Sequence, residues 1–162
     1  MIINPFEIVT RHVKADTPVN LDALASDLGV SIKRTNLDDD IAGMIERNAD
    51  GTYTVSVNED QHPNRQRFTI AHELGHFVLH KKLIGDGVDD TKMYRSTDAG
   101  KYHNKNFAKI QETEANQFAA TLLMPTHLIK KYLELGVSEA SILSGIFGVS
   151  EQAMEIRLRS FP

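Results

Sequence analysis

The chain has 162 residues, of which 41% are hydrophobic and 25% are charged, with a formal net charge of −4 at pH 7. This length supports one domain with its own core and is too short for two comfortable ones. The absence of cysteine excludes disulfides, thiolate metal sites and a cysteine nucleophile. Acidic and basic residues are interspersed, which argues against a nucleic-acid surface, and no window approaches the roughly 18 apolar residues of a membrane helix. We therefore expect a cytoplasmic protein that does not associate with membranes.

The first third of the chain predicts two helices followed by a small sheet. Asn4 and Asn20 can cap helices, and Gly29 ends the second one. Three β-like runs follow, at residues 30–37, 41–47 and 53–58. Asp50-Gly51 marks the turn between the last two runs. We expect a small, mainly antiparallel sheet, in which the exposed edge of the third run could receive an extended substrate by strand addition.

A helix is predicted over about residues 67–80, entered from a polar loop at residues 58–65 that contains Pro63. Four apolar residues gather on one side of its helical wheel: Ile70, Leu74, Phe77 and Val78. Two histidines lie on roughly the opposite side, so we expect the helix to be covered on both sides. Gly75 costs about 1 kcal/mol in a helix interior relative to alanine, which indicates another element packed very close to it.

The same helix carries the pentapeptide His72-Glu73-Leu74-Gly75-His76. Histidines at i and i+4 lie one turn apart on the same face, so both imidazoles can bind a single metal ion. Glu73 projects about 100° further round, where it can reach a water on the metal without being a ligand. We therefore predict His72 and His76 as metal ligands and Glu73 as the catalytic base. The alternative is a buried helix whose two histidines are only hydrogen-bonded.

A catalytic zinc site needs a third protein ligand and an open position for water. Lys82 stands where another class of peptidase has a third histidine. His80 lies two turns, about 12 Å of helix rise, from His72 and cannot readily share the ion. The remaining pattern is a carboxylate on a second helix, which is predicted over residues 107–124 and stopped by Pro125.

Two glutamates of that second helix are candidates, and helical periodicity separates them. At about 100° per residue, Glu112 lies on the side of Asn116 and of two small alanines. The alanines would let the two helices approach, so Glu112 is predicted to face inward as the third metal ligand. Asn116, one turn further on, could hydrogen-bond a ligand histidine. Glu114 lies on another side and is predicted to be a solvated surface residue.

Residues 81–105 form a long polar segment with little periodicity, which we expect to border the cleft. A site of this kind usually has a further hydrogen-bond donor to the oxyanion. The candidates by location are His80, Tyr94, Tyr102 and His103. For each of them a surface or packing role is the simpler interpretation.

Three short helices are predicted after residue 125, with Thr126, Ser138 and Ser150 as their caps. The last two, in residues 136–162, resemble a helix-turn-helix, which raises the possibility of a DNA-binding module. The would-be reading helix exposes Glu151 and Glu155, which repel phosphates, so direct nucleic-acid binding is not expected. We instead expect residues 136–162 to pack on the domain formed by residues 1–135.

The sequence is similar to the ImmA/IrrE family of HEXXH metallopeptidases. The matching stretches are Val57-Asn58, residues 67–76 and residues 112–125, within a resemblance that covers roughly residues 20–135. The resemblance implies an α+β, zincin-like fold in which the sheet packs on the HEXXH helix. It also implies a glutamate-liganded Zn²⁺, with Glu112 as the third protein ligand.

The family resemblance further implies a regulatory endopeptidase whose partner is a protein substrate, an Xre-type helix-turn-helix repressor or antitoxin. Two other classes of function stay open. One is a DNA-binding regulator that acts through residues 136–162. The other is a protein that keeps the metal fold but binds a partner without turnover, against which the intact Glu73 argues.

Overall fold

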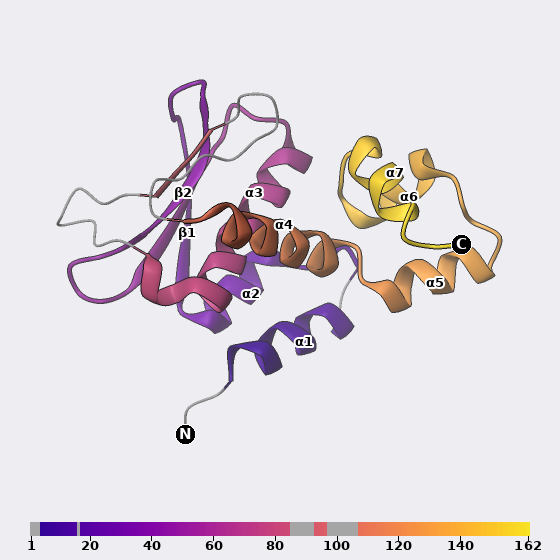
Figure 1. Ribbon diagram of the computed structural model, residues 1–162, viewed down its shortest axis with the longest axis horizontal. Helices are drawn as coiled ribbons and strands as arrows, with labels where there is room; N and C mark the ends of the chain where they lie inside the picture. The colour runs from indigo at the N-terminus through magenta and orange to yellow at the C-terminus, as the bar shows by residue number, and fades with distance from the viewer. Residues whose placement is uncertain (1–3, 16, 85–92, 97–106) are drawn as a thin grey trace.

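A four-stranded sheet and seven α-helices make up the described part of the chain, residues 4–15, 17–84, 93–96 and 107–162 of a computed structural model (Figure 1). The strands are β1 (Val30–Thr35), β2 (Ile41–Arg47), β3 (Tyr53–Asn58) and β4 (Met93–Ser96). The helices are α1 (Pro5–Ala15), α2 (Leu21–Leu28), α3 (Pro63–His80), α4 (Lys109–Leu123), α5 (Thr126–Glu134), α6 (Ala140–Phe147) and α7 (Glu151–Leu158), with a short 3₁₀ turn, η1 (Lys81–Leu83), directly after α3. The predicted α+β class is confirmed.

The strands lie in the order β1-β3-β2-β4. Strand β2 runs antiparallel to β3 and to β4, whereas β1 pairs with β3 in parallel, so the prediction of a mainly antiparallel sheet is confirmed. The prediction of an exposed edge along β3 is wrong, because β3 is hydrogen-bonded on both sides. Val55 lies opposite Ile32 of β1 and also opposite Ile45 of β2. Within the described residues, the edges of this sheet are β1 and β4.

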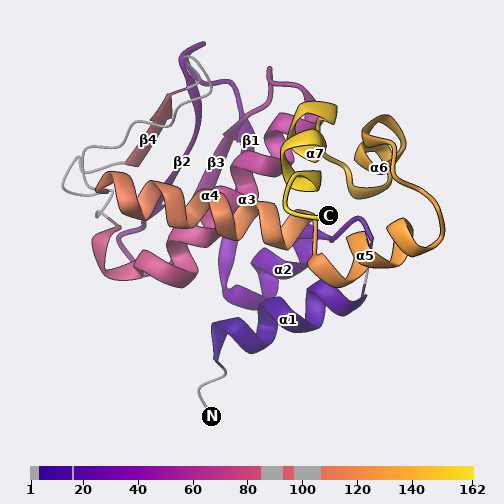
Figure 2. The ribbon, with the colours of Figure 1, turned by 45° about the vertical axis from the view of Figure 1, so that its right-hand side comes forward.

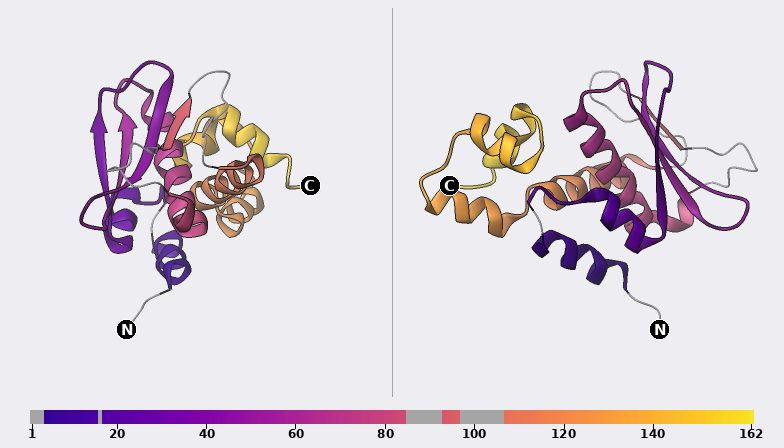
Figure 3. Two further views of the ribbon diagram at one scale, coloured as in Figure 1. Left: turned by 60° about the vertical axis from the view of Figure 1, so that its left-hand side comes forward. Right: turned by 180° about the vertical axis from the view of Figure 1, so that it is seen from behind.

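Helix α3 lies between the sheet and α4 (Figures 2 and 3). Its apolar side is buried as predicted, and the ring of Phe77 meets that of Tyr53 in β3 edge to face, with 5.1 Å between the centroids. Strand β2 also requires a glycine where Thr69 of α3 packs against it. A Cβ atom on Gly43 of β2 would lie 2.6 Å from Cγ2 of Thr69 and 2.7 Å from the carbonyl oxygen of Ser56.

The opposite side of α3 packs against α4, as the glycine in its interior predicted. A Cβ atom on Gly75 would lie 3.0 Å from Cδ1 of Phe118 and 3.3 Å from the carbonyl oxygen of Ala115. Ala115 and Ala119 are fully buried on the facing side of α4. The small residues on both helices therefore set the short separation that a glutamate of α4 needs to reach the histidines of α3.

Several predicted helix starts need correction. Helix α3 begins at Pro63 and not near residue 67, because proline suits the first helical position and the side chain of His62 caps it by accepting from the amide of Asn64. Asn20 and Ser150 cap α2 and α7 as predicted. The predicted caps Thr126 and Ser138 are wrong, since Pro125 and Glu139 hold those positions without a side-chain hydrogen bond. Thr126 is itself the first residue of α5, and its hydroxyl instead accepts from Nη2 of Arg157 at 2.9 Å.

The carboxyl-terminal helices α5, α6 and α7 lie at the end of the molecule away from the sheet (Figure 1). Buried residues of α6 and α7, among them Phe147 and Met154, belong to the same apolar cluster as Leu74 and Val55. Arg67 of α3 spans the junction, since Nε donates to the carbonyl of Gly148 and Nη1 donates to that of Val19, both at 3.1 Å. No helix within the described residues is long and apolar enough to cross a membrane.

Candidate metal centre

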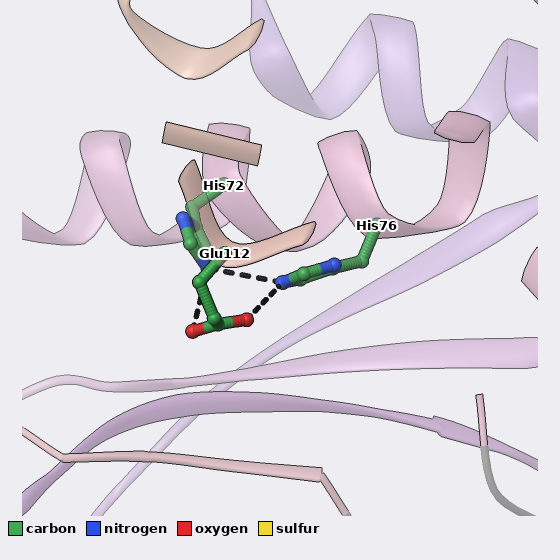
Figure 4. A group of neighbouring side chains, drawn as sticks. All are labelled: His72, His76 and Glu112. Carbon is green, nitrogen blue, oxygen red and sulfur yellow. Dashed lines mark hydrogen bonds and ion pairs between the residues drawn. The ribbon is translucent and has the colours of Figure 1, made fainter. Parts of the chain in front are cut away.

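Two neighbouring helices bring three donor groups together. His72 and His76 come from successive turns of α3, and Glu112 comes from the first turn of α4 (Figure 4). The Nε2 atoms of the histidines are 3.2 Å apart. Oε1 of Glu112 lies 2.8 Å from Nε2 of His76, and Oε2 lies 3.8 Å from Nε2 of His72. Both histidine side chains are fully buried, and that of Glu112 is only 12% exposed.

These separations fit a single small cation. Zinc bonds nitrogen and oxygen at about 2.0–2.2 Å, so the donor atoms of a tetrahedral site lie about 3.3–3.6 Å apart. The separations of 2.8, 3.2 and 3.8 Å lie on both sides of that range, the first and the last being measured to different oxygens of Glu112, and one ligand atom from each residue lies within 4.8 Å of the others. Two imidazoles and one carboxylate are also the donor types of a catalytic zinc site, in which the fourth position is left for water. The residues present therefore fit a zinc ion.

Asn116 contacts the first histidine. Its Oδ1 lies 2.7 Å from Nδ1 of His72. Because an amide oxygen only accepts, Nδ1 of His72 carries the hydrogen and its Nε2 lone pair faces the other donors. The structure thus brings Asn116 to the place that helical periodicity predicted for it, one turn beyond Glu112 on α4.

The second histidine is held by residues whose role the sequence did not reveal. Nδ1 of His76 lies 2.9 Å from Nδ1 of His80, and Nε2 of His80 lies 3.2 Å from Oε1 of Glu114. Phe107 stacks on the imidazole of His76, with centroids 3.8 Å apart and planes within 2° of parallel. Glu114 is about half exposed, as predicted, but its carboxylate is engaged. The spacing of His80, four residues after His76, is the signal that could have indicated this contact.

The other residues proposed from the sequence fall into three groups. Glu73 is fully buried on α3, in the core beside the histidines. His80 has both ring nitrogens engaged, which leaves neither for an oxyanion. Of the remaining oxyanion candidates, Tyr94 lies in β4, of which only the backbone is described, and Tyr102 and His103 lie outside the described residues.

Comparison with known proteins identifies the family of this chain. Residues 25–159 match the model of the Peptidase_M78 family, which is described as the IrrE N-terminal-like domain. The chain belongs to this metallopeptidase family. The match includes both helices of the candidate metal centre and the whole of the carboxyl-terminal helices α5, α6 and α7. Membership of Peptidase_M78 implies a bound metal, and the donor geometry above shows where this chain could hold one.

Three similar proteins match this chain to different extents. The radiation response metalloprotease IrrE of Deinococcus radiodurans is 38% identical over 80 residues, which are 49% of this chain and 22% of that protein. The protein of the same name from Deinococcus deserti is 37% identical over 89 residues, 52% of this chain and 28% of its own length. Uncharacterized immunity region protein 2 of Bacillus phage phi105 is 27% identical over 140 residues, 85% of this chain and 80% of that protein. This chain therefore spans only about a quarter of the IrrE proteins but most of the phage protein.

Proposed function

We propose that this chain is a zinc-dependent endopeptidase of regulatory type, with His72, His76 and Glu112 as the protein ligands of the metal and Glu73 as the general base. The observation that carries the proposal is the convergence of three buried donors from α3 and α4 at the spacing of a tetrahedral site. Family membership supports the class of reaction.

The roles of the residues follow from their chemistry. Zinc, when bound, supplies a Lewis acid for the scissile carbonyl and lowers the pKa of water towards about 7. His72 and His76 present their Nε2 lone pairs because their Nδ1 atoms are hydrogen-bonded on the far side. A carboxylate oxygen of Glu73 takes the proton of the attacking water and later delivers it to the leaving amine. Asn116 holds the ring of His72 in the productive orientation.

For the substrate we propose a protein, an Xre-type helix-turn-helix repressor or antitoxin, in the cytoplasm. The supporting observations are the family and the phage relative, whose name refers to an immunity region. We also infer that residues 136–162 belong to the same domain as residues 1–135, because they share its apolar cluster and are hydrogen-bonded to it through Arg67.

A DNA-binding role for the carboxyl-terminal helices is less well supported by their contacts. Arg157 of α7 is turned inward: Nε donates to the carbonyl of Met124 at 3.1 Å, and Nη2 donates to the hydroxyl of Thr126. Burial lowers the pKa of the Arg157 guanidinium below its ordinary value, as expected for a cation taken partly out of water. This cation is therefore committed to holding α7 against the start of α5, and Glu151 and Glu155 stay exposed.

The first test is zinc stoichiometry in purified protein after saturation with zinc and desalting. We expect about one zinc per chain in the wild type and essentially none in Glu112→Ala, because removing one of three protein ligands leaves only two to hold the ion. Glu114→Ala, an acidic control two residues away, should still bind about one zinc at saturation. Absence of zinc from the wild type, or full retention by Glu112→Ala, would contradict the proposed ligand set.

The second test concerns the base. Glu73→Gln should retain about one zinc per chain but cleave an Xre-type repressor at least a thousandfold more slowly, because glutamine has nearly the same shape and cannot accept a proton. Cleavage is followed by gel and mass spectrometry with the repressor in excess. A Glu73→Gln variant that cuts at the wild-type rate would remove Glu73 from this role. Zinc-loaded wild type that binds the repressor without cutting it would favour the partner-binding alternative.

A further inference from the structure

A chain of three side chains runs from the candidate metal centre to the protein surface. It starts at the buried His76, passes through His80, which is 9% exposed, and ends at Glu114, whose side chain is 49% exposed. The two links are 2.9 Å between the Nδ1 atoms of the histidines and 3.2 Å between Nε2 of His80 and Oε1 of Glu114. Helix α3 supplies the first two residues and α4 supplies the third, so the chain also ties together the two helices that carry the metal donors.

Hydrogen-bond chemistry fixes the direction of this chain. A carboxylate only accepts, so Nε2 of His80 must carry the hydrogen that faces Glu114. A neutral His80 with its hydrogen on Nε2 has a lone pair on Nδ1. The short contact between the Nδ1 atoms then requires the hydrogen to sit on His76. His76 is left with its lone pair on Nε2. Because that atom lies 2.8 Å from the carboxylate of Glu112, this tautomer requires a metal ion, or a hydrogen on the glutamate, between the two groups.

The opposite arrangement would disable the metal site. If His80 carried its hydrogen on Nδ1, its Nε2 lone pair would face the negative charge of Glu114. His76 would then accept through Nδ1 and carry its own hydrogen on Nε2, where it would block metal binding. The carboxylate of Glu114 therefore selects, through two rings, the tautomer that His76 needs. The stacked ring of Phe107 keeps His76 in the plane that this contact requires.

We propose that Glu114 and His80 are positioning residues for the metal: together they hold His76 in the tautomer that presents Nε2 to the ion. This inference rests on the proposed function, since it concerns the same site. It gives the two ligand histidines different supports. His72 is oriented by one neutral amide, whereas His76 is oriented by a two-step chain that ends in a charged group at the surface.

The direct test reads the ring hydrogens by ¹⁵N-edited nuclear magnetic resonance of histidine-labelled protein. In the wild type, His80 should carry its hydrogen on Nε2 with or without zinc, and zinc-loaded protein should show His76 with its hydrogen on Nδ1. In Glu114→Ala, the His80 ring should become a mixture of both tautomers. A wild-type His80 with its hydrogen on Nδ1, or a Glu114→Ala spectrum unchanged at His80, would overturn the proposal.

The functional test is zinc affinity, measured by competition with a chromophoric chelator. Loss of an outer partner of a ligand histidine typically costs 10- to 100-fold in metal affinity, and for the half-exposed Glu114 we expect about a tenfold loss in Glu114→Ala. Glu114→Gln keeps an accepting oxygen and should stay within about threefold of the wild type. Glu134→Ala removes the same charge from an exposed position on α5 and should not change the affinity.

A pair of substitutions at His80 separates the hydrogen bond from packing. Asn can place an accepting oxygen where Nδ1 stands, so His80→Asn should retain most of the zinc affinity, whereas His80→Leu should lose at least tenfold. Equal affinities in these two variants would overturn the proposal. If the wild type binds zinc and Glu114→Ala binds it equally well, the positioning chain fails and the metal site stands. If the wild type binds no zinc, the proposed function fails. The nuclear magnetic resonance comparison of the wild type with Glu114→Ala then still shows whether Glu114 selects the tautomer of His80.

Discussion

Each histidine of the candidate metal centre contacts one atom outside that centre through its Nδ1. Nδ1 of His72 lies 2.7 Å from Oδ1 of Asn116, and Nδ1 of His76 lies 2.9 Å from Nδ1 of His80. The contact with Asn116 is the shorter of the two. Because His72 is fully buried, no water can readily replace this partner. Leaving a buried donor unpaired costs about 1–3 kcal/mol, and the ring would also lose its fixed orientation. Asn116 should therefore affect both stability and metal affinity.

Asn116→Ala tests this dependence. We expect zinc affinity to fall at least tenfold and the free energy of unfolding of the metal-free protein to fall by about 1–3 kcal/mol. Asn116→Asp supplies a charged acceptor of the same length and should hold zinc at least as well as the wild type. The exposed neighbour Gln117, changed to alanine, serves as the control in chelator competition and urea unfolding. Wild-type zinc affinity in Asn116→Ala would show that the contact does not orient His72.

The sequence predicts which side of a helix a residue occupies, but it does not predict the contact that the imidazole of His80 makes with a second helix. Spacing along one helix placed Asn116 on the side of Glu112, because the relative direction of two residues on the same helix depends only on helical geometry. The contact of His80 with Glu114 joins two helices, and it depends on their separation and on the rotamers of both side chains. Spacing alone correctly showed Glu114 as exposed. It could not show that an exposed carboxylate reaches a buried imidazole.

The contact between α3 and α4 sets the distance from the histidines to Glu112. Gly75 lies in this contact, with the carbonyl of Ala115 and the ring of Phe118 opposite it. A methyl group on Gly75 would meet a backbone oxygen at 3.3 Å, and backbone does not yield as a flexible side chain does. Helix α4 would have to move by a few tenths of an ångström, and Glu112 would move with it.

Gly75→Ala measures that tolerance. Alanine favours the helix by about 1 kcal/mol, but overpacking a close contact costs about 1–3 kcal/mol, so we expect a net loss of stability of about 1 kcal/mol. Zinc affinity should also fall severalfold because the donor spacing widens. Gly145→Ala, in α6, is the matched control, since nothing lies within 4 Å of its added methyl group and it should gain up to about 1 kcal/mol. A Gly75→Ala protein as stable as the Gly145→Ala protein would contradict the close packing.

The sequence predicted the hairpin pairing in the sheet but not the parallel pairing. Alternation of the apolar residues Tyr53, Val55 and Val57 identified β3, and Asp50-Gly51 correctly marked its hairpin with β2. The parallel pairing of β1 with β3 could not be read in the same way. It joins strands that are neighbours in the sheet but not consecutive in the sequence, and the choice of partner depends on how α2 and α3 cover the strands. This is why β3 was expected at an edge and is found inside the sheet.

Arg67 connects the parts of the molecule that are farthest apart in sequence. It donates to the carbonyl of Val19 before α2 and to that of Gly148 between α6 and α7. Burial lowers the pKa of its guanidinium below the ordinary value, while the charge of Asp22 acts in the opposite direction. Desolvation of the cation thus offsets part of what its hydrogen bonds contribute. The hydrogen bond of Arg67 to Gly148 fixes the position of the carboxyl-terminal helices.

Arg67→Met keeps the length of the side chain and removes its donors. We expect the free energy of unfolding to fall by about 1–3 kcal/mol, because two carbonyl groups lose charged partners in a partly buried place. Hydrogen exchange should accelerate most at the amides of α6 and α7. Arg11→Met, at an exposed position on α1, removes the same charge and should have little effect. Unchanged exchange in α6 and α7 would show that the apolar cluster holds them without Arg67.

Removal of the metal should lower the stability of the whole domain, including the carboxyl-terminal helices. A ligand that binds only the folded state stabilises it by about 2.7 kcal/mol when its free concentration is one hundred times its dissociation constant. The donors come from α3 and α4, whose apolar faces share one cluster with residues of α6 and α7. We therefore expect a chelator to lower the unfolding midpoint of the wild type in one transition that includes the carboxyl-terminal helices. Glu112→Ala should show no such shift. A zinc-dependent transition that leaves α6 and α7 unaffected would instead mean that these helices unfold as a separate unit and that the shared cluster does not couple them to the metal centre.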